Sequence, residues 1–295
     1  MQASSYNFTS YTGFFKYDSA EGNPKSLPAV AANFGLNDNT TWSDLEQTLT
    51  KLNTESLAKD GSSYKLIYAN RHGQGFHNVG ESKYGTPEWD AKWSLLNGDG
   101  NITWGPDARL TPLGIQQAQD VNDAWMSLLK QDDSPPLPTK LYVSPLSRAL
   151  STLEIGYNKV LLNNTSTNGH LLSSPHNLTP QIRESFREMY GEHTCDQRRT
   201  KSEIHADYPD AAFQPSFSEQ DTLWTPERET TDHLDARIKA ALIDAWNESR
   251  PDQVIALTSH SGVMQSLFRV VGHYPVSPPT GAMIPLIVKA TPSSS

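Results

Sequence analysis

Short apolar runs alternate with longer amphipathic stretches over most of this chain. The runs at residues 65–70, 141–144 and 253–258 are rich in Leu, Ile, Val and Tyr, a composition typical of strands. Weaker runs at 179–183 and 282–288 predict two further strands.

Helical spacing of apolar residues separates these runs. Thr111-Pro112 opens one helix, because a capping residue is followed by a proline that suits the first helical turn. We expect further helices over residues 147–157 and 225–247, and a last one that runs to Val271. Strands that alternate with helices predict an α/β fold, a three-layer sandwich with a mostly parallel central sheet and helices on both faces.

The domain organisation follows from where this alternation begins. Residues 1–63 are expected to form an N-terminal arm that packs on the core, with a helix opened by the capping-box pattern Ser43-Asp44-Leu45-Glu46. Residues 64–295 are expected to form the catalytic domain. Within it, residues 81–109 lack clear periodicity, which indicates a long excursion that covers a site.

Composition narrows the choice of partners and compartment. No apolar run approaches the ~18 residues of a membrane span, and the formal charge of −9 argues against nucleic acid and against an anionic membrane as partners. Cys195 is the single cysteine, so no intrachain disulfide can form. Residues 1–17 lack the features of a secretory signal, and we expect a cytoplasmic protein. The sequence carries no signal of oligomeric state.

The stretch Arg71-His72-Gly73 follows the first strong strand directly. In open α/β sheets, ligands bind beyond the carboxyl ends of the strands. Arginine presents a planar fork that matches two phosphate oxygens, and a neutral imidazole is a competent nucleophile near pH 7. Alone, this tripeptide is more often a polar loop.

Two more groups follow later strands. Arg148 stands at the start of a helix after the strand that ends at Ser144, where a helix N-terminus already favours anions. His260 follows the strand at 253–258, and we expect a protonated imidazole there that stabilises charge on a phosphate. Taken singly, the first is more often part of a surface ion pair and the second a buried structural histidine.

Together these motifs resemble branch 1 of the histidine phosphatase superfamily, the phosphoglycerate-mutase-like group. That family's R-H-G with a later asparagine appears here as residues 71–73 with Asn78. Its L-T-x-x-G-x-x-Q-A motif appears at 110–118, its S-x-L-x-R-A motif at 144–149, and its late histidine as His260. Within the family, the chain is most similar to the yeast phosphomutase-like group.

The resemblance implies a role for each matching residue. His72 would be the phosphorylated nucleophile, and Arg71, Arg148, His260 and Asn78 would complete the phosphate pocket. The family also uses a carboxylic acid in an L-R-E segment to protonate the leaving oxygen. Phe186-Arg187-Glu188 fits that segment best, so we assign the role to Glu188.

Two choices stay open at this stage. Glu184, in the nearby Ile182-Arg183-Glu184, competes with Glu188 for the role of acid. Arg198 and Arg199 either contact a second anionic group of the substrate or form ion pairs outside the site. We expect no metal and no cofactor, because His72 and His77 have no convergent carboxylate or cysteine set beside them.

The function implied is hydrolysis of the phosphate monoester of a small metabolite through a phosphohistidine. One alternative is a phosphomutase, which returns the phosphoryl group to substrate, although the family's mutase-type E-R-H-Y-G segment is absent. Another is a non-catalytic phosphate-binding protein on the same fold.

Overall fold

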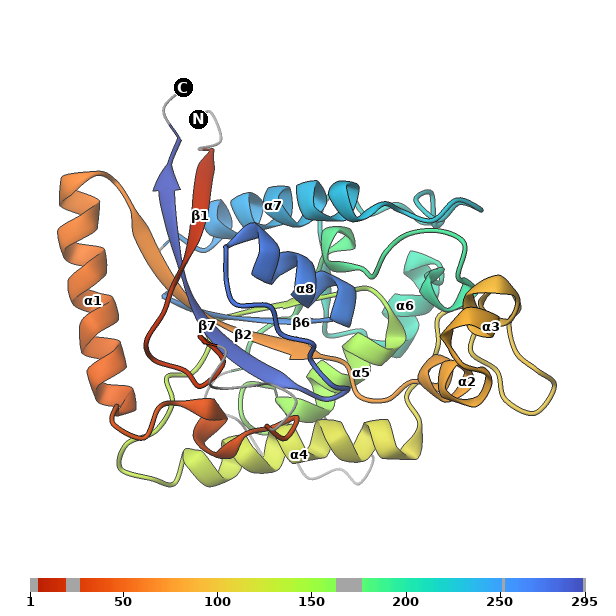
Figure 1. Cartoon of the computed structure of the whole chain (residues 1–295), viewed down its shortest axis with the longest axis horizontal. Helices are drawn as coiled ribbons and strands as arrows, with labels where there is room; N and C mark the ends of the chain where they lie inside the picture. Colours follow the sequence, from red (N-terminus) through yellow and green to blue (C-terminus); the bar gives the residue numbers. More distant parts are fainter. Residues whose placement is uncertain (1–4, 20–26, 163–176, 251–252, 294–295) are drawn as a thin grey trace.

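The central sheet has seven strands in the order β1-β7-β2-β6-β3-β4-β5. The computed structural model describes residues 5–19, 27–162, 177–250 and 253–293 (Figure 1). From β2 to β5 all neighbouring strands are parallel, whereas β7 pairs antiparallel with both β1 and β2. The strands are β1 Tyr6–Tyr11, β2 Ser63–Arg71, β3 Lys140–Val143, β4 Gln181–Ile182, β5 Ala212–Phe213, β6 Val254–Ser259 and β7 Met283–Pro292.

Helices cover both faces of the sheet. On one face α7 packs against α8, and on the other α4 packs against α5 (Figure 1). The α-helices are α1 Trp42–Lys59, α2 Phe76–Tyr84, α3 Thr86–Ala91, α4 Pro112–Leu128, α5 Ser147–Gly156, α6 Lys201–Asp207, α7 Thr231–Glu248 and α8 Ser261–Val270. The predicted α/β sandwich with a mostly parallel sheet is therefore confirmed. None of the helices that the structure describes is both long and apolar enough to cross a membrane.

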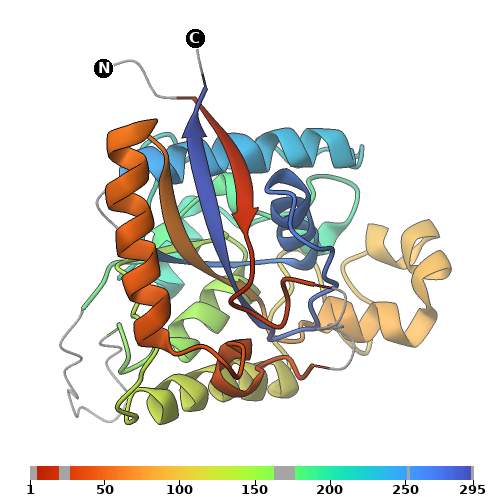
Figure 2. The ribbon, with the colours of Figure 1, turned by 60° about the vertical axis from the view of Figure 1, so that its left-hand side comes forward.

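Residues 1–63, expected as an arm on the core, contribute an edge strand and a helix. β1 pairs with β7, and α1 runs beside the sheet (Figure 2). Trp42 of α1 is fully buried and lies 6.4 Å from Tyr68 of β2, measured between ring centroids. Because Trp125 of α4 contacts the same tyrosine ring at 5.1 Å, α1 and α4 share one face of β2.

Two helix starts differ from the prediction. α1 begins after Thr41, whose side chain accepts the Asp44 N–H in a capping box, and not at Ser43, whose N–H donates to Asp133 instead. The helix expected from residue 225 begins at Thr231. Residues 225–230 are not helical because their backbone bonds a neighbouring loop: the Glu192 N–H donates to the carbonyl of Thr225, and the Glu229 N–H to that of Tyr190.

Strand register brings the polar groups of the predicted site to one edge of the sheet. Arg71, the last residue of β2, pairs with Ser259 at the end of β6, and Val143 of β3 pairs with Thr258. His72, Ser144 and His260 each follow directly. The excursion at 81–109 lies beyond these strand ends as α2 and α3 (Figure 1), with a small apolar cluster of its own around Trp89 and Trp104.

Candidate active site

A cavity of about 240 Å³ opens at the carboxyl edge of the sheet. Five of the six residues predicted for the site line it: Arg71, His72, Asn78, Arg148 and Glu188. The sixth, His260, lies directly behind, with its ring centroid 5.1 Å from that of His72. The structure therefore brings all six predicted residues together.

The imidazole of His72 has a defined orientation and tautomer. Its Nδ1 lies 2.7 Å from the carbonyl oxygen of Gly73, so Nδ1 carries the proton and donates, which leaves the lone pair on Nε2. Burial, Arg148 and Arg71 hold the pKa of this imidazole well below its usual 6.5. The ring is therefore neutral near pH 7, the form that a nucleophile requires.

Two guanidinium groups flank this imidazole, that of the half-buried Arg71 and that of the buried Arg148. Arg71 donates to the Pro278 carbonyl through Nη1 (2.9 Å), and its Nε has no partner among the described residues. Arg148 is 1% exposed; it donates to the carbonyl of Cys195 (2.8 Å) and to Asp196 Oδ1 (2.6 Å). Its Nε also has no partner within the described part of the chain. Buried donors of this kind are costly unless a ligand takes them up.

His260 approaches the site from the end of β6. Its Nε2 lies 2.7 Å from the Ser144 hydroxyl, while its buried Nδ1 has no partner among the residues described. We expected a protonated ring, but burial and Arg148 hold the pKa of His260 well below 6.5. The protein groups alone therefore favour the neutral imidazole, and protonation needs the negative charge of a phosphate.

Glu188 is held at the N-terminus of α8. Its Oε2 accepts the Gly262 N–H at 3.1 Å and its Oε1 the Met189 N–H at 3.0 Å. A Cβ on residue 262 would lie 2.2 Å from Oε1, so only glycine lets the carboxyl group come this close. Two arginines bond the backbone of the loop at residues 188–191. Arg228 donates to the carbonyls of Met189 and Gly191, and Arg237 donates to the carbonyl of Glu188.

Glu184, the competitor for the role of acid, does not line the cavity. It belongs to what we call the ion-pair cluster, formed by Glu184, Arg187, Arg198 and Asp221. Arg187 and Arg198 take one carboxylate oxygen of Glu184 each, and Arg187 also makes a two-bond contact with Asp221, at 2.9 and 2.7 Å. Both Glu184 oxygens are thus occupied, and of the two glutamates it is Glu188 that lines the cavity with His72.

Arg198 and Arg199 form ion pairs away from the cavity. Arg198 bonds Glu184 within the ion-pair cluster. Arg199 bonds Asp107 at 3.0 Å and Asp207 at 2.9 Å. Of the two alternatives weighed from the sequence, a contact with a second anionic group of the substrate has no support from this arrangement.

Asn78 and its neighbour contribute from the first turn of α2. Asn78 Oδ1 accepts the Gly75 N–H at 3.0 Å, which fixes the side chain at the cavity. His77 also lines the cavity, with its ring centroid 5.3 Å from that of His72. Sequence reasoning weighed His77 only as a metal ligand, although its place beside Asn78 in the motif was a usable signal.

Other cavity residues were missed from the sequence altogether. Asp196 bridges two arginines, with Oδ1 bonded to Arg148 and Oδ2 to Arg228. Glu81 and Asp90 line the outer wall. Asp196 stands in the stretch 187–199, which resembles a subgroup of fungal and plant mutase-like proteins, but the resemblance implied no role for it. Glu81 and Asp90 come from segments without periodic pattern.

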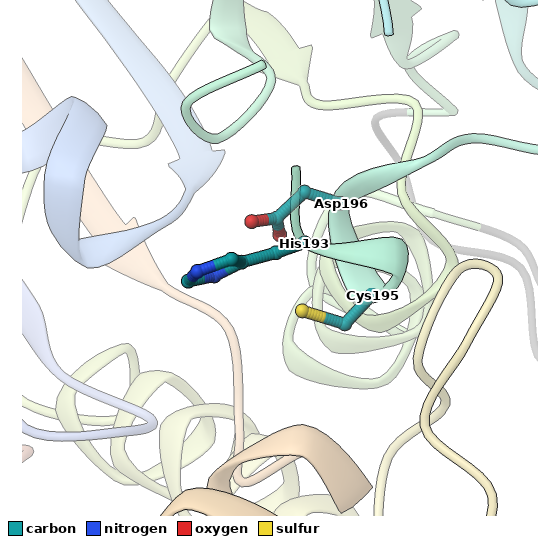
Figure 3. Close-up of side chains that lie close together, drawn as sticks. All are labelled: His193, Cys195 and Asp196. Atoms are coloured by element: carbon teal, nitrogen blue, oxygen red, sulfur yellow. The ribbon is translucent and has the colours of Figure 1, made fainter. Parts of the chain in front are cut away.

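One group in the described part of the chain has the spacing of metal ligands. His193, Cys195 and Asp196 offer ligand atoms within 4.8 Å of one another, and their side chains project toward the same space (Figure 3). Burial raises the pKa of the Cys195 thiol well above its usual range, and both Asp196 oxygens already bond guanidinium groups. Two positive charges at this point disfavour a cation.

Comparison with known proteins identifies relatives of this chain. The sequence profile of the histidine phosphatase superfamily (branch 1) matches residues 67–282. The "Probable phosphoglycerate mutase" of Arthroderma benhamiae is 36% identical, over 98% of this chain and 86% of its own length. The "Probable phosphoglycerate mutase PMU1" of Saccharomyces cerevisiae is 35% identical, over 77% of this chain and 79% of its own length.

Solved structures with a similar fold include both mutases and phosphatases. A phosphoglycerate mutase from Bacillus anthracis superposes with a TM-score of 0.47 at 14% identity, over 79% of this chain and 93% of that chain. An ecdysone phosphate phosphatase from Bombix mori superposes with a TM-score of 0.45 at 15% identity, over 78% of this chain and 92% of that chain.

Proposed function

Because this chain belongs to the histidine phosphatase superfamily (branch 1), we propose that it hydrolyses phosphate monoesters of small metabolites, with His72 as the group that carries the phosphoryl. Members of this superfamily act as phosphatases or mutases. The choice of hydrolysis, and the role of each residue, are inferences from the cavity.

In the first step Nε2 of His72 attacks phosphorus, and the bond between phosphorus and the ester oxygen breaks. Glu188, in its protonated form, gives its proton to the departing alcohol. The proton remains on Nδ1 of His72 and keeps its hydrogen bond to the Gly73 carbonyl. This hydrogen bond stabilises the positive charge that the ring gains as its Nε2 bonds to phosphorus.

The second step regenerates the enzyme. Glu188, now a carboxylate, takes a proton from a water molecule whose oxygen attacks phosphorus, and the bond between phosphorus and His72 breaks. Inorganic phosphate leaves, the electron pair returns to Nε2, and Glu188 is protonated for the next cycle. Arg71 and Arg148 stabilise the equatorial oxygens in both steps, together with His260, whose protonated form is favoured by the negative charge of the bound phosphate.

The observation that carries this proposal is the His72 tautomer. A buried neutral imidazole whose Nδ1 donates to a backbone carbonyl at 2.7 Å, beside two guanidinium groups that line the same cavity, has its lone pair on the other nitrogen. Such an arrangement suits transfer of a phosphoryl group better than simple binding of phosphate, because binding alone would call for donors.

The test is a panel of phosphate monoesters, incubated with the protein and with His72→Ala. We expect release of inorganic phosphate from several esters and none above background with the variant. Isomerised ester without free phosphate would establish the mutase instead. No turnover of any ester, with inorganic phosphate still bound, would make the chain a phosphate-binding protein.

A further inference from the structure

With Glu188 protonated, as the proposed first step requires, the cavity carries no net positive charge, although it is a candidate site for a dianion. Three arginines and four carboxylates line it: Arg71, Arg148, Arg228, Glu81, Asp90, Glu188 and Asp196. Two of these arginines share Asp196, at 2.6 and 2.9 Å. Only Arg71 forms no ion pair in the described part of the chain.

The two outer carboxylates stand on the excursion beyond the strand ends. Glu81 lies in α2 and Asp90 in α3. Neither forms an ion pair with Lys or Arg within the described ranges: Glu81 accepts the Thr86 hydroxyl at 3.0 Å, and the charged neighbour of Asp90 would be His193 Nε2, at 3.6 Å. Burial and Arg228 lower the pKa of that histidine below 6.5, so it is neutral near pH 7.

Glu81 and Asp90 line the same cavity as Arg71 and Arg148, so we infer that the alcohol part of an ester lies near these two carboxylates when its phosphate bonds the arginines. A dianionic phosphate bound there would bond Arg71 and Arg148 and leave Glu81 and Asp90 without a cation to offset them. A carboxylate or second phosphate on the alcohol would then meet like charge from the half-buried Glu81 and the exposed Asp90. A hydroxyl group on the alcohol would instead find hydrogen-bond acceptors in these carboxylates. An ammonium group would find charge of the opposite sign.

We propose that Glu81 and Asp90 determine specificity by charge, so that the substrate is a phosphate monoester whose alcohol part is neutral or positively charged and bears no second acidic group. The inference rests on the proposed hydrolysis at His72. It sets this chain apart from the substrate that the names of its curated relatives imply, since phosphoglycerate carries a carboxylate next to the phosphorylated alcohol.

Two esters isolate the charge. Glycerol 3-phosphate and 3-phosphoglycerate, both used as racemates, differ only in a hydroxymethyl group in place of a carboxylate. We expect kcat/KM for glycerol 3-phosphate to exceed that for 3-phosphoglycerate by about tenfold or more. A smaller series extends the test to positive charge: phosphoethanolamine should be hydrolysed at least as well as 2-hydroxyethyl phosphate, and phosphoglycolate least.

The variant Glu81→Gln/Asp90→Asn removes both charges and keeps the shape of both side chains. We expect it to raise kcat/KM for 3-phosphoglycerate and to reduce the gap between the two esters to about threefold or less. Glu88→Gln is the matched control, because Glu88 is an exposed residue of α3 that does not line the cavity. It should leave the ratio unchanged.

The assay separates failure of this inference from failure of the proposed function. Release of phosphate from p-nitrophenyl phosphate reports hydrolysis alone; without it the proposed function fails, and the specificity falls with it. If p-nitrophenyl phosphate is hydrolysed but 3-phosphoglycerate is cleaved as fast as glycerol 3-phosphate, the inference is wrong and the hydrolase stands. A gap that persists in the double variant would also overturn it, because the selection would then not arise from these charges.

Discussion

Two neighbouring parts of this protein bury arginines, and they use them differently. In the ion-pair cluster, Arg187 meets both oxygens of Asp221 and one of Glu184. In the cavity, Arg71 has a backbone carbonyl as partner and no carboxylate within ion-pair distance among the described residues. A half-buried guanidinium in a cavity with no carboxylate partner indicates an anionic ligand, whereas a buried one that is fully paired indicates a structural role.

The same contrast separates two glutamates only four residues apart. Glu184 and Glu188 each follow an arginine in a similar sequence, yet the first is bonded by two guanidinium groups and the second lines the cavity that also holds His72. We therefore expect substitutions in the cavity to lower kcat, and substitutions in the ion-pair cluster to lower the free energy of unfolding.

Loss of the nucleophile should have the largest effect. His72→Ala should lower phosphate release by at least about 10⁴-fold, because no other group in the account can form the covalent intermediate. The thermal midpoint should change little or rise, since the substitution removes a buried imidazole. Steady-state kinetics and thermal unfolding of the same preparation check both. Hydrolysis that survives would contradict the role of His72.

Glu188→Gln should lower kcat by about 10²- to 10⁴-fold, because the amide cannot transfer a proton. Its carbonyl oxygen can still accept the Gly262 N–H, so the free energy of unfolding should change by less than about 1 kcal/mol. Measured as kcat/KM, which reports the first step and not the hydrolysis of the phosphohistidine, the loss should be smaller for esters with good leaving groups, such as p-nitrophenyl phosphate, since they need no proton. An equal loss for poor and good leaving groups would argue against Glu188 as the acid.

Glu184→Gln is the matched change in the ion-pair cluster. It leaves Arg187 and Arg198 with one carboxylate, and should lower the free energy of unfolding by about 3 kcal/mol. The kcat of the folded fraction should stay within a few-fold of the parent. Urea unfolding and active-site-normalised kinetics separate the two effects. If Glu184→Gln reduced kcat as severely as Glu188→Gln, the assignment of the two glutamates would be wrong.

The two regions should also respond to acid in different pH windows. The pKa of the His72 imidazole is lowered by burial and by Arg148, so the unfolded chain takes up a proton near pH 6.5 that the folded chain does not. Stability is therefore unaffected above that pH and falls as pH drops through it. Asp221 behaves differently: its pKa is held below 3.8 by hydrogen bonds and charge from Arg187, against the effect of burial. Its contribution is present above 3.8 and is lost only below.

This difference gives the smallest expected effect. Between pH 7 and 5.5 the free energy of unfolding should decline with pH, and His72→Phe should reduce the slope by up to about 1.4 kcal/mol per pH unit. Over the same range, kcat/KM should show no fall caused by protonation of His72. If kcat/KM fell by half near pH 6.5 and recovered at higher pH, His72 would have the pKa of an ordinary histidine, which would contradict this prediction.

Much of the fold was accessible from the sequence because buried parallel strands leave continuous apolar runs. The runs at 65–70, 141–144 and 253–258 correspond to β2, β3 and β6. Strand ends then placed Arg71 and His260 at one edge. Pairing of β7 antiparallel to β2 was not predicted, since an isolated apolar run carries no information on direction.

The outer part of the cavity was beyond sequence reasoning for a physical reason. Glu81, Asp90 and Arg228 come from segments whose course is set by tertiary contacts, such as the bonds of residues 225–230 to the 190–192 loop. The choice between Glu184 and Glu188 likewise depends on which charged partners fold against each, and both stand in the same local pattern. The sequence predicted which side chains lie at the strand ends, and only the folded chain shows which of their charges have no partner.

The central claim is that His72 carries the phosphoryl group, and trapping tests it most directly. The protein is mixed with a ³²P-labelled phosphate monoester, quenched in alkali, in which an N–P bond survives and acid would cleave it, and digested for mass spectrometry. We expect label on the peptide that contains His72, at Nε2, and none in His72→Ala. Turnover of the ester with label on another residue, or with no label under conditions that preserve phosphohistidine, would contradict it.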